Sequence, residues 1–578
     1  MLTPMVHIRS VSRSALLALT LLSACAASGP TASVSASGPR KSPPGNAAPG
    51  AFGAYLAGRF AANETDLDVA ADNFLHALAA DPGNEELQQQ AFLATLMAGR
   101  PDAVRLARGL KDNQAAQLLL ADQDVKAGNW DNAELRFRAL PKQGLTQVLQ
   151  PVLLAWAQQG AGHTDAALAT LRPYMEGQRF RGVYTLHAAL IADLANRPAD
   201  AAKLYRLAEA EAGGTNLRLA QILASWQTRQ GHPADAQRTL AALAEQGDEL
   251  SIALPTLGQG LNTRPVPRAA DGIAEAYLAL AAALRQQDAS DFSLILLRLA
   301  LDLRPDYTAA RLLIADVMDS GKHPAAALKV LSAVPPSDPL APVIRLRRAA
   351  LTEREGNTDD AMKQLEQLAR DEPTRPEPLA MLGDLMRTKQ RFPEAVSAYD
   401  RAIARIGTPA TKDWPLFYDR GIAEERAHQW GKAEADLQRA LQLSPDQPYV
   451  LNYLAYSWTE QGHNLTQARR MIDRAVEQRP NDGSIVDSLG WVQLRQGDSA
   501  GAIKSLERAV ELEPEDATIN GHLGDAYSAA GRKLEAQFQW RRALTLNPEP
   551  DDAAKLEAKL HEGAQAGNGP TTADRRVQ

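Results

Sequence analysis

The sequence predicts an all-α fold, an α-solenoid of about fourteen helix hairpins in two stacked sub-arrays. Three observations support this fold class. The chain has 578 residues, which exceeds what one ordinary hydrophobic core holds and favours an extended array. Aromatic residues make up only 5% of it, as expected where helices with small side chains pack closely. Small residues also return about every 34 positions, the length of one helix hairpin.

The last repeat shows this pattern most clearly. Ala536, Trp540 and Ala543 share one face of a helix, which Pro548 ends. The alanines let this helix approach its neighbours, Trp540 fills the gap between them, and Gly524 allows a similar close approach in the preceding helix. This spacing resembles the signature of the tetratricopeptide repeat. The resemblance implies a right-handed superhelix whose concave face binds other proteins.

The same spacing continues toward the N-terminus. The position of Ala536 is occupied in the preceding repeats by Ala502, Ala468, Ala433, Ala395, Ala361, Ala327 and Ser293. In the first half of the chain the repeat pattern is weaker but keeps the same phase. The corresponding positions there are Ala70, Val104, Ala133, Ala167, Ala201 and Ala236. Between these two series, closely spaced prolines and glycines interrupt any helix. We therefore expect an N-terminal array over 51–244, an irregular connector over 245–270 and a C-terminal array over 271–548.

Residues 1–24 have the features of an export signal. Arg9 and Arg13 form its basic segment, and the apolar run that follows is too short to span a bilayer. Cys25 comes next and is the only cysteine in the chain. The sequence Leu22-Ser23-Ala24-Cys25 resembles the bacterial lipobox, which implies that Cys25 carries lipid. Because alanine and not aspartate follows this cysteine, the resemblance also implies attachment to the periplasmic face of the outer membrane.

Low-complexity segments flank the predicted arrays. Residues 25–50 are rich in Ser, Gly, Pro and Ala without apolar periodicity, so we expect the lipidated cysteine to be followed by a disordered tether. At the other end, residues 549–563 are predicted to form a capping helix that covers the last apolar face. The remainder, 564–578, is predicted to be a disordered tail.

Charge and motifs argue for binding and against catalysis. The chain has 62 basic and 69 acidic residues, a net charge of −7, which should repel nucleic acid. His561 and Glu562 begin like a zinc-binding H-E-x-x-H helix, but Gln565 stands where the second histidine would be. No serine or threonine is recognisably poised beside a base. We therefore expect no enzyme activity, no cofactor and no metal.

Candidate binding residues follow from the hairpin architecture. The first helix of each hairpin lines the concave face of such an array, so its non-packing positions are available to a partner protein. The candidates in the best repeats are Tyr418, Arg426, Tyr453, Asp487, Trp491, Arg495 and Asp525. Aromatic side chains beside arginine and aspartate are typical of protein-binding hot spots. The alternative is that Tyr453 and Trp491 only fill space within the hairpins.

The segment from Pro448 to Leu544 carries a more specific resemblance. Its sequences Val450-Leu451-Asn452-Tyr453 and Phe538-Gln539-Trp540-Arg541-Arg542 are similar to the C-terminal part of a proteobacterial family of tetratricopeptide lipoproteins. Some members of that family are outer-membrane adaptors that bind and activate a periplasmic carboxyl-terminal processing protease. The resemblance therefore implies a membrane-tethered scaffold for periplasmic proteins. The alternative function is an assembly factor for an outer-membrane secretion or exopolysaccharide export machine.

Overall fold

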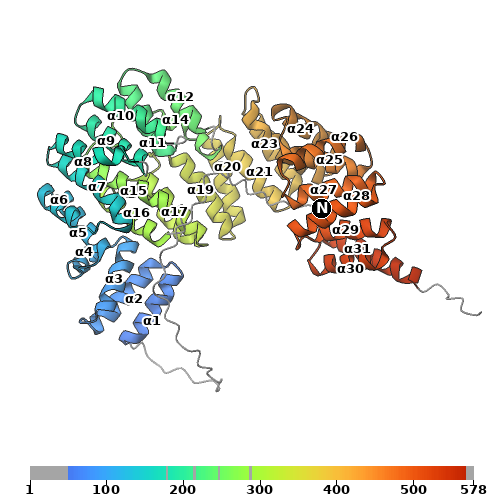
Figure 1. The fold of residues 1–578 in the computed structure, drawn as a ribbon, viewed down its shortest axis with the longest axis horizontal. Coiled ribbons are helices and arrows are strands. Elements are labelled where there is room, and N and C mark those ends of the chain that lie inside the picture. The colour runs from blue at the N-terminus through green and yellow to red at the C-terminus, as the bar shows by residue number, and fades with distance from the viewer. Residues whose placement is uncertain (1–49, 178–179, 213–215, 245–247, 286–289, 568–578) are drawn as a thin grey trace, which may run out of the picture. The chain divides into compact units, whose positions relative to one another are not determined.

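The computed structural model describes residues 50–567 except 178–179, 213–215, 245–247 and 286–289, and this part of the chain is helical with no strand (Figure 1). The first six hairpins are α1 (Ala51–Asn63) with α2 (Leu67–Ala80), α3 (Glu85–Ala98) with α4 (Asp102–Ala107), α5 (Gln114–Lys126) with α6 (Trp130–Ala139), α7 (Gly144–Gly160) with α8 (Thr164–Met175), α9 (Arg181–Leu194) with α10 (Pro198–Glu211), and α11 (Leu217–Arg229) with α12 (Pro233–Ala244). Two one-turn helices follow, α13 (Asp248–Ser251) and α14 (Leu254–Leu257).

Eight further hairpins complete the repeats. They are α15 (Ala269–Arg285) with α16 (Ser290–Leu303), α17 (Thr308–Ser320) with α18 (Pro324–Ser332), α19 (Ala341–Arg354) with α20 (Thr358–Asp371), α21 (Glu377–Thr388) with α22 (Phe392–Ile403), α23 (Trp414–Arg426) with α24 (Trp430–Leu443), α25 (Pro448–Gln461) with α26 (Leu465–Gln478), α27 (Gly483–Arg495) with α28 (Ser499–Leu512), and α29 (Ala517–Ala529) with α30 (Lys533–Thr545). A 3-10 turn, η1 (Thr411–Asp413), precedes α23, and α31 (Pro550–Gly567) follows α30. The described residues thus form fourteen hairpins, and the predicted fold class is confirmed.

The small residues of the repeat pattern make this packing possible. In the last hairpin Ala536 is 1% exposed and Ala543 is completely buried, and both lie with Trp540 in one apolar cluster. A Cβ atom on Gly524 would lie 2.4 Å from Cδ1 of Trp540, so only glycine lets α29 approach α30 this closely. Leu556 of α31 joins the same cluster and covers the end of the array.

Contacts divide the chain into two compact units, and the boundary between them in the sequence lies between residues 408 and 409. Their described residues are 50–408, here the N-terminal unit, and 409–567, the C-terminal unit. This boundary falls outside the predicted connector over 245–270, because α15 and α16 pack onto α5 and α7. The separation of the repeats into arrays over 51–244 and 271–548 stays a prediction.

The α15–α16 hairpin occupies part of the inner side of the preceding repeats. Tyr277 of α15 donates a hydrogen bond of 2.9 Å to Asp122 of α5, and both side chains are buried. Gly272 of α15 lies against the ring of Trp156 on α7, where a Cβ atom would come within 2.2 Å. Asp302 of α16 accepts hydrogen bonds from Gln123 and Lys126 of α5. The trough of the first repeats is therefore partly filled by the chain itself.

The predicted export signal and Cys25 lie outside the described residues, as does most of the predicted tether. Among the helices that are described, none has the length and apolar composition needed to cross a bilayer.

Candidate protein-binding surfaces

The seven predicted binding residues all lie on first helices of hairpins in the C-terminal unit. α23 carries Tyr418 and Arg426, α25 carries Tyr453, α27 carries Asp487, Trp491 and Arg495, and α29 carries Asp525. Each hairpin contributes its first helix to the same side of the array, so residues far apart in sequence come together there.

The aromatic residues on these helices contact one another. The ring of Tyr418 meets that of Tyr453 edge to face with centroids 5.9 Å apart, and the Tyr453 hydroxyl donates to Glu425 over 3.2 Å. Trp491 stacks on His522 of α29 at a centroid distance of 4.1 Å. The Trp491 indole also donates a 2.6 Å hydrogen bond to Glu460. These ring contacts hold neighbouring hairpins together, so Tyr453 and Trp491 do have the packing role that the sequence analysis gave as the alternative. Trp491 also borders a small cavity.

Asp487 has no exposed surface, although it was expected to face a partner directly. Its carboxylate contacts Nδ1 of His522 at 3.0 Å, and His522 lies between it and solvent with 12% of its side chain exposed. The repeat pattern predicts which face of the helix carries Asp487, but it does not predict whether that side chain is buried. His522 was not among the predicted residues, because no spacing rule pairs it with a residue one repeat earlier.

The small cavity, of about 150 Å³, lies between α25, α27, α29 and α31. Its polar and aromatic lining residues are Tyr456, Glu460, Trp491, Thr518, His522, Asp525, Asp552, Lys555 and Lys559. Lys559 of α31 donates to both carboxylate oxygens of Asp525, over 2.8 and 2.7 Å. The structure thus brings the predicted residues Trp491 and Asp525 to one cavity. Tyr418, Arg426, Tyr453, Asp487 and Arg495 do not line it, and their role in binding stays a prediction.

The buried His522–Asp487 pair predicts a pH-dependent stability of the C-terminal unit. Burial alone lowers the pKa of His522, but the charge and hydrogen bond of Asp487 outweigh it, with smaller contributions from Asp525 and Glu460, so this pKa is raised above 6.5. The ion pair therefore stabilises the unit fully below about pH 6.5, and this contribution disappears as the pH rises through the raised pKa. Thermal unfolding should show a loss of stability as the pH is raised above about 6.5. In His522→Gln, which keeps a donor but does not titrate, this loss should be absent.

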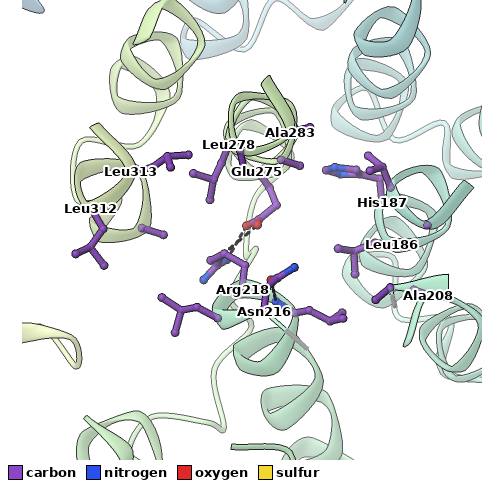
Figure 2. Close-up of a pocket in the computed structure, with 18 of the residues that line it drawn as sticks. Leu186, His187, Ala208, Asn216, Arg218, Glu275, Leu278, Ala283, Leu312 and Leu313 are labelled. Carbon is purple, nitrogen blue, oxygen red and sulfur yellow. Dashed lines mark hydrogen bonds and ion pairs between the residues drawn. The ribbon is translucent and has the colours of Figure 1, made fainter. Parts of the chain in front are cut away.

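A much larger cavity, of about 840 Å³, lies within the N-terminal unit (Figure 2). Leucines from several helices form its walls, with Leu186 on α9, Leu278 on α15, and Leu312 and Leu313 on α17. Small residues of α15, among them Ala282 and Ala283, leave the space between these walls open. This cavity could not be predicted from the sequence, because it forms only where the α15–α16 hairpin lies inside the earlier repeats.

The charged groups at this cavity are paired. Arg218 of α11 donates to Glu275 of α15 with contacts of 3.1 and 2.6 Å, and Tyr307 donates to the same carboxylate over 2.6 Å. Burial by itself would raise the pKa of Glu275, but Arg218 holds this pKa below its usual value. Arg347 contacts both Glu249 and Asp316. With its ions neutralised in this way, the cavity offers chiefly apolar surface.

His187 of α9 is the histidine among the residues that line this cavity, and its side chain is completely buried. The Trp156 indole donates to its Nδ1 over 3.0 Å, so in the neutral ring the proton is on Nε2. That Nε2 has no hydrogen-bond partner in the described structure. Burial lowers the pKa of His187 to about 4, which keeps the ring neutral. In Figure 2 the imidazole extends from α9 toward α15, and its Nε2 is buried.

Comparison with known proteins identifies the repeats. Residues 268–413 match the model of the tetratricopeptide repeat-like domain, and residues 418–483 and 488–549 match that of the tetratricopeptide repeat. The chain therefore contains tetratricopeptide-repeat domains. Such repeats are scaffolds for protein–protein interaction, and the chain is a scaffold of this kind.

A TPR repeat-containing protein of Pseudomonas aeruginosa is 25% identical over 199 residues, which is 34% of this chain. The match spans only 33% of the length of that curated relative. Among solved structures, the Cut9–Hcn1 complex of the APC/C is 14% identical, with 88% of this chain and 95% of that one covered and a TM-score of 0.38. Yeast Tom70 is 12% identical, with 81% and 97% covered and a TM-score of 0.33.

Proposed function

We propose that this chain is a membrane-tethered scaffold that holds a segment of a partner protein in the large cavity of the N-terminal unit. The observation that supports this most strongly is the cavity itself. At about 840 Å³ it lies in the size range of ligand-binding pockets, and leucine and alanine are the commonest residues in its walls. Because its charged groups are already paired within the chain, an apolar segment gains more from entering it than a charged one.

An apolar helix is the occupant that suits this place best. The inner side of the same repeats already accepts one helix, α15, through close contact at Gly272. A partner helix with small and apolar residues on one face would pack beside α15 in the same manner.

The proposed tether is Cys25, which we infer to carry lipid at the periplasmic face of the outer membrane. A tether of about 25 residues has a root-mean-square reach of roughly 25–30 Å, so it keeps the array near the membrane. Holding two proteins at one surface raises their effective concentration and can increase apparent affinity by about two orders of magnitude or more. A carboxyl-terminal processing protease and its substrates are the partners that this proposal favours.

The proposal is tested by capturing partners with full-length protein from membranes of the native host. Ala282→Trp, which fills the cavity from an exposed position on α15, should weaken capture at least about tenfold while thermal stability is kept. The matched control is Ala166→Trp, at an exposed position on α8 outside the cavity. A captured serine protease would support the adaptor role, whereas a barrel protein or glycan synthase would favour the assembly-factor alternative. Equal capture by both variants would exclude the cavity as the binding site.

A further inference from the structure

The first helix of the array exposes a stripe of large apolar side chains. On α1, Phe52 is 75%, Leu56 50% and Phe60 70% exposed, and their spacing of four residues places them along one side of the helix. The opposite side carries the buried residues Ala54 and Gly58 and packs against α2. The outer side of α1 is therefore apolar where solvent would favour polar residues.

The far end of the array is built differently. Repeat arrays need terminal elements with a polar outer face, because the last repeat otherwise exposes the surface that its neighbour would cover. At the C-terminal end α31 meets this need, since Leu556 turns inward and Asp551, Lys555 and Glu557 face solvent. Helix α1 exposes Arg59 and Asn63 near its end, but large apolar side chains make up most of its outer side. This difference between the two ends suggests that the apolar stripe on α1 is covered by something other than this chain.

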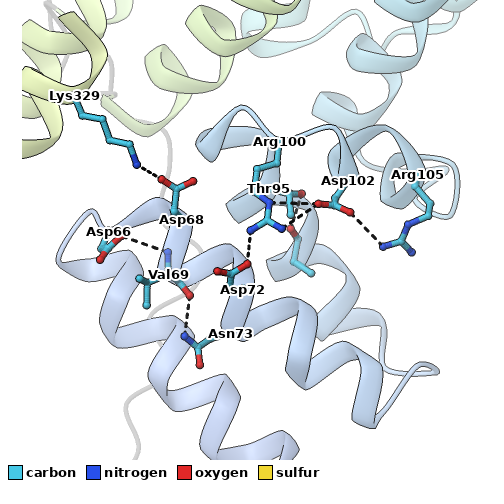
Figure 3. A network of polar contacts seen from close by, with 11 residues as sticks. Asp66, Asp68, Val69, Asp72, Asn73, Thr95, Arg100, Asp102, Arg105 and Lys329 are labelled. Carbon is cyan, nitrogen blue, oxygen red and sulfur yellow. Dashed lines mark hydrogen bonds and ion pairs between the residues drawn. The ribbon is translucent and has the colours of Figure 1, made fainter. Parts of the chain in front are cut away.

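Polar contacts hold the first hairpin in place from the other side (Figure 3). Asp68 of α2 pairs with Lys329 of α18, and Asp72 pairs with Arg100, which also contacts Asp102 at 3.2 Å. On the inner side of α1, the Tyr55 hydroxyl donates to Glu86 over 3.1 Å. These contacts join the hairpin to the rest of the N-terminal unit through α2 and α3, so the stripe on α1 is left facing outward.

The size of the stripe argues against a protein as its cover. The exposed parts of two phenylalanines and one leucine present roughly 400 Å² of surface. A stable protein interface needs about 800 Å² from each partner, so neither a second copy nor a freely diffusing protein would stay bound through this stripe alone. A lipid surface is subject to no such minimum if the chain is already anchored to it.

We propose that α1 is an interfacial helix that lies against the lipid surface with Phe52, Leu56 and Phe60 inserted among the acyl chains. This inference rests on the proposed lipid tether at Cys25. Only residues 26–50 separate that cysteine from α1, so the anchor and the stripe reach the same membrane. The lipid holds the protein at the surface, and α1 gives the array a fixed orientation on it.

The test uses the full-length lipoprotein in vesicles of phosphatidylethanolamine and phosphatidylglycerol. A fluorophore is attached at Leu56→Cys in the stripe or, as a control, at Val69→Cys, which is 44% exposed on the neighbouring helix α2. Because Cys25 is the only native cysteine and its thiol would be acylated, the introduced thiol takes the label. Iodide in the aqueous phase should quench the label at residue 56 at least about threefold less than the label at residue 69.

Equal quenching at both positions would overturn the inference while leaving the tether untouched. Protection of residue 56 that disappears when the protein is diluted to about one molecule per vesicle would also overturn it, because a second copy would then be the cover. The tether is examined separately by mass spectrometry of the full-length lipoprotein. If the mass shows no acyl chains on Cys25, the proposed lipid anchor fails, whatever the labels report.

Discussion

Replacing Glu275 by alanine is expected to lower the free energy of unfolding of the N-terminal unit by about 3–5 kcal/mol. The side chain of Glu275 is 4% exposed and that of its partner Arg218 is 15% exposed. Without the carboxylate, the guanidinium stays buried with no opposite charge at this position, and the Tyr307 hydroxyl loses its acceptor. The decrease is measured as a shift of the urea midpoint for this unit.

The matched control for this prediction removes the whole network. Arg218→Met, Glu275→Leu and Tyr307→Phe together leave no buried charge or hydroxyl without a partner, so this triple variant should unfold close to the wild-type midpoint. A single Glu275→Ala variant with unchanged stability would show that α15 is not held inside the earlier repeats by this network.

The sequence was sufficient to predict the hairpins themselves. Each hairpin needs small residues where its helices meet, and this requirement recurs at fixed spacing, as at Ala502 and Ala536, which are 0% and 1% exposed. The close fit of Gly524 against Trp540 follows from the same rule. Periodicity records contacts between neighbours in sequence, so it is informative for this part of the fold.

Contacts between distant repeats could not be predicted in this way. Tyr277 and Asp122 are 155 residues apart, and no spacing rule indicates that the helix carrying one will lie against the helix carrying the other. The large cavity depends on that arrangement, so it was missed. His522 was missed for another reason: it contacts Asp487 of the adjacent repeat, and the repeat pattern shows that these helices are neighbours but not which of their side chains pair.

These differences change where partner binding is expected. Several aromatic and acidic residues predicted to face a partner are engaged within the C-terminal unit, where Trp491 bonds to Glu460 and Asp525 to Lys559. The N-terminal unit, in contrast, keeps a large apolar cavity beside α15. Hydrophobic burial is the larger source of binding free energy, so we expect this cavity to contribute more to partner binding than the predicted residues do.

A photo-crosslinker inside the cavity should therefore form an adduct with a partner polypeptide in nearly every complex. Leu313 of α17 lines the cavity and can be replaced by an aliphatic diazirine residue of similar size, which preserves the packing. The control position is Leu135 on α6, which is 64% exposed and does not line the cavity.

The most direct measurement is the yield of crosslinked partner at these two positions after irradiation in intact cells. If the cavity holds a segment of another protein, residue 313 gives one dominant adduct, Ala282→Trp abolishes it, and residue 135 gives none. Equal yields at residues 313 and 135, or an adduct that persists in Ala282→Trp, would contradict the claim that this cavity is where the scaffold holds its partner.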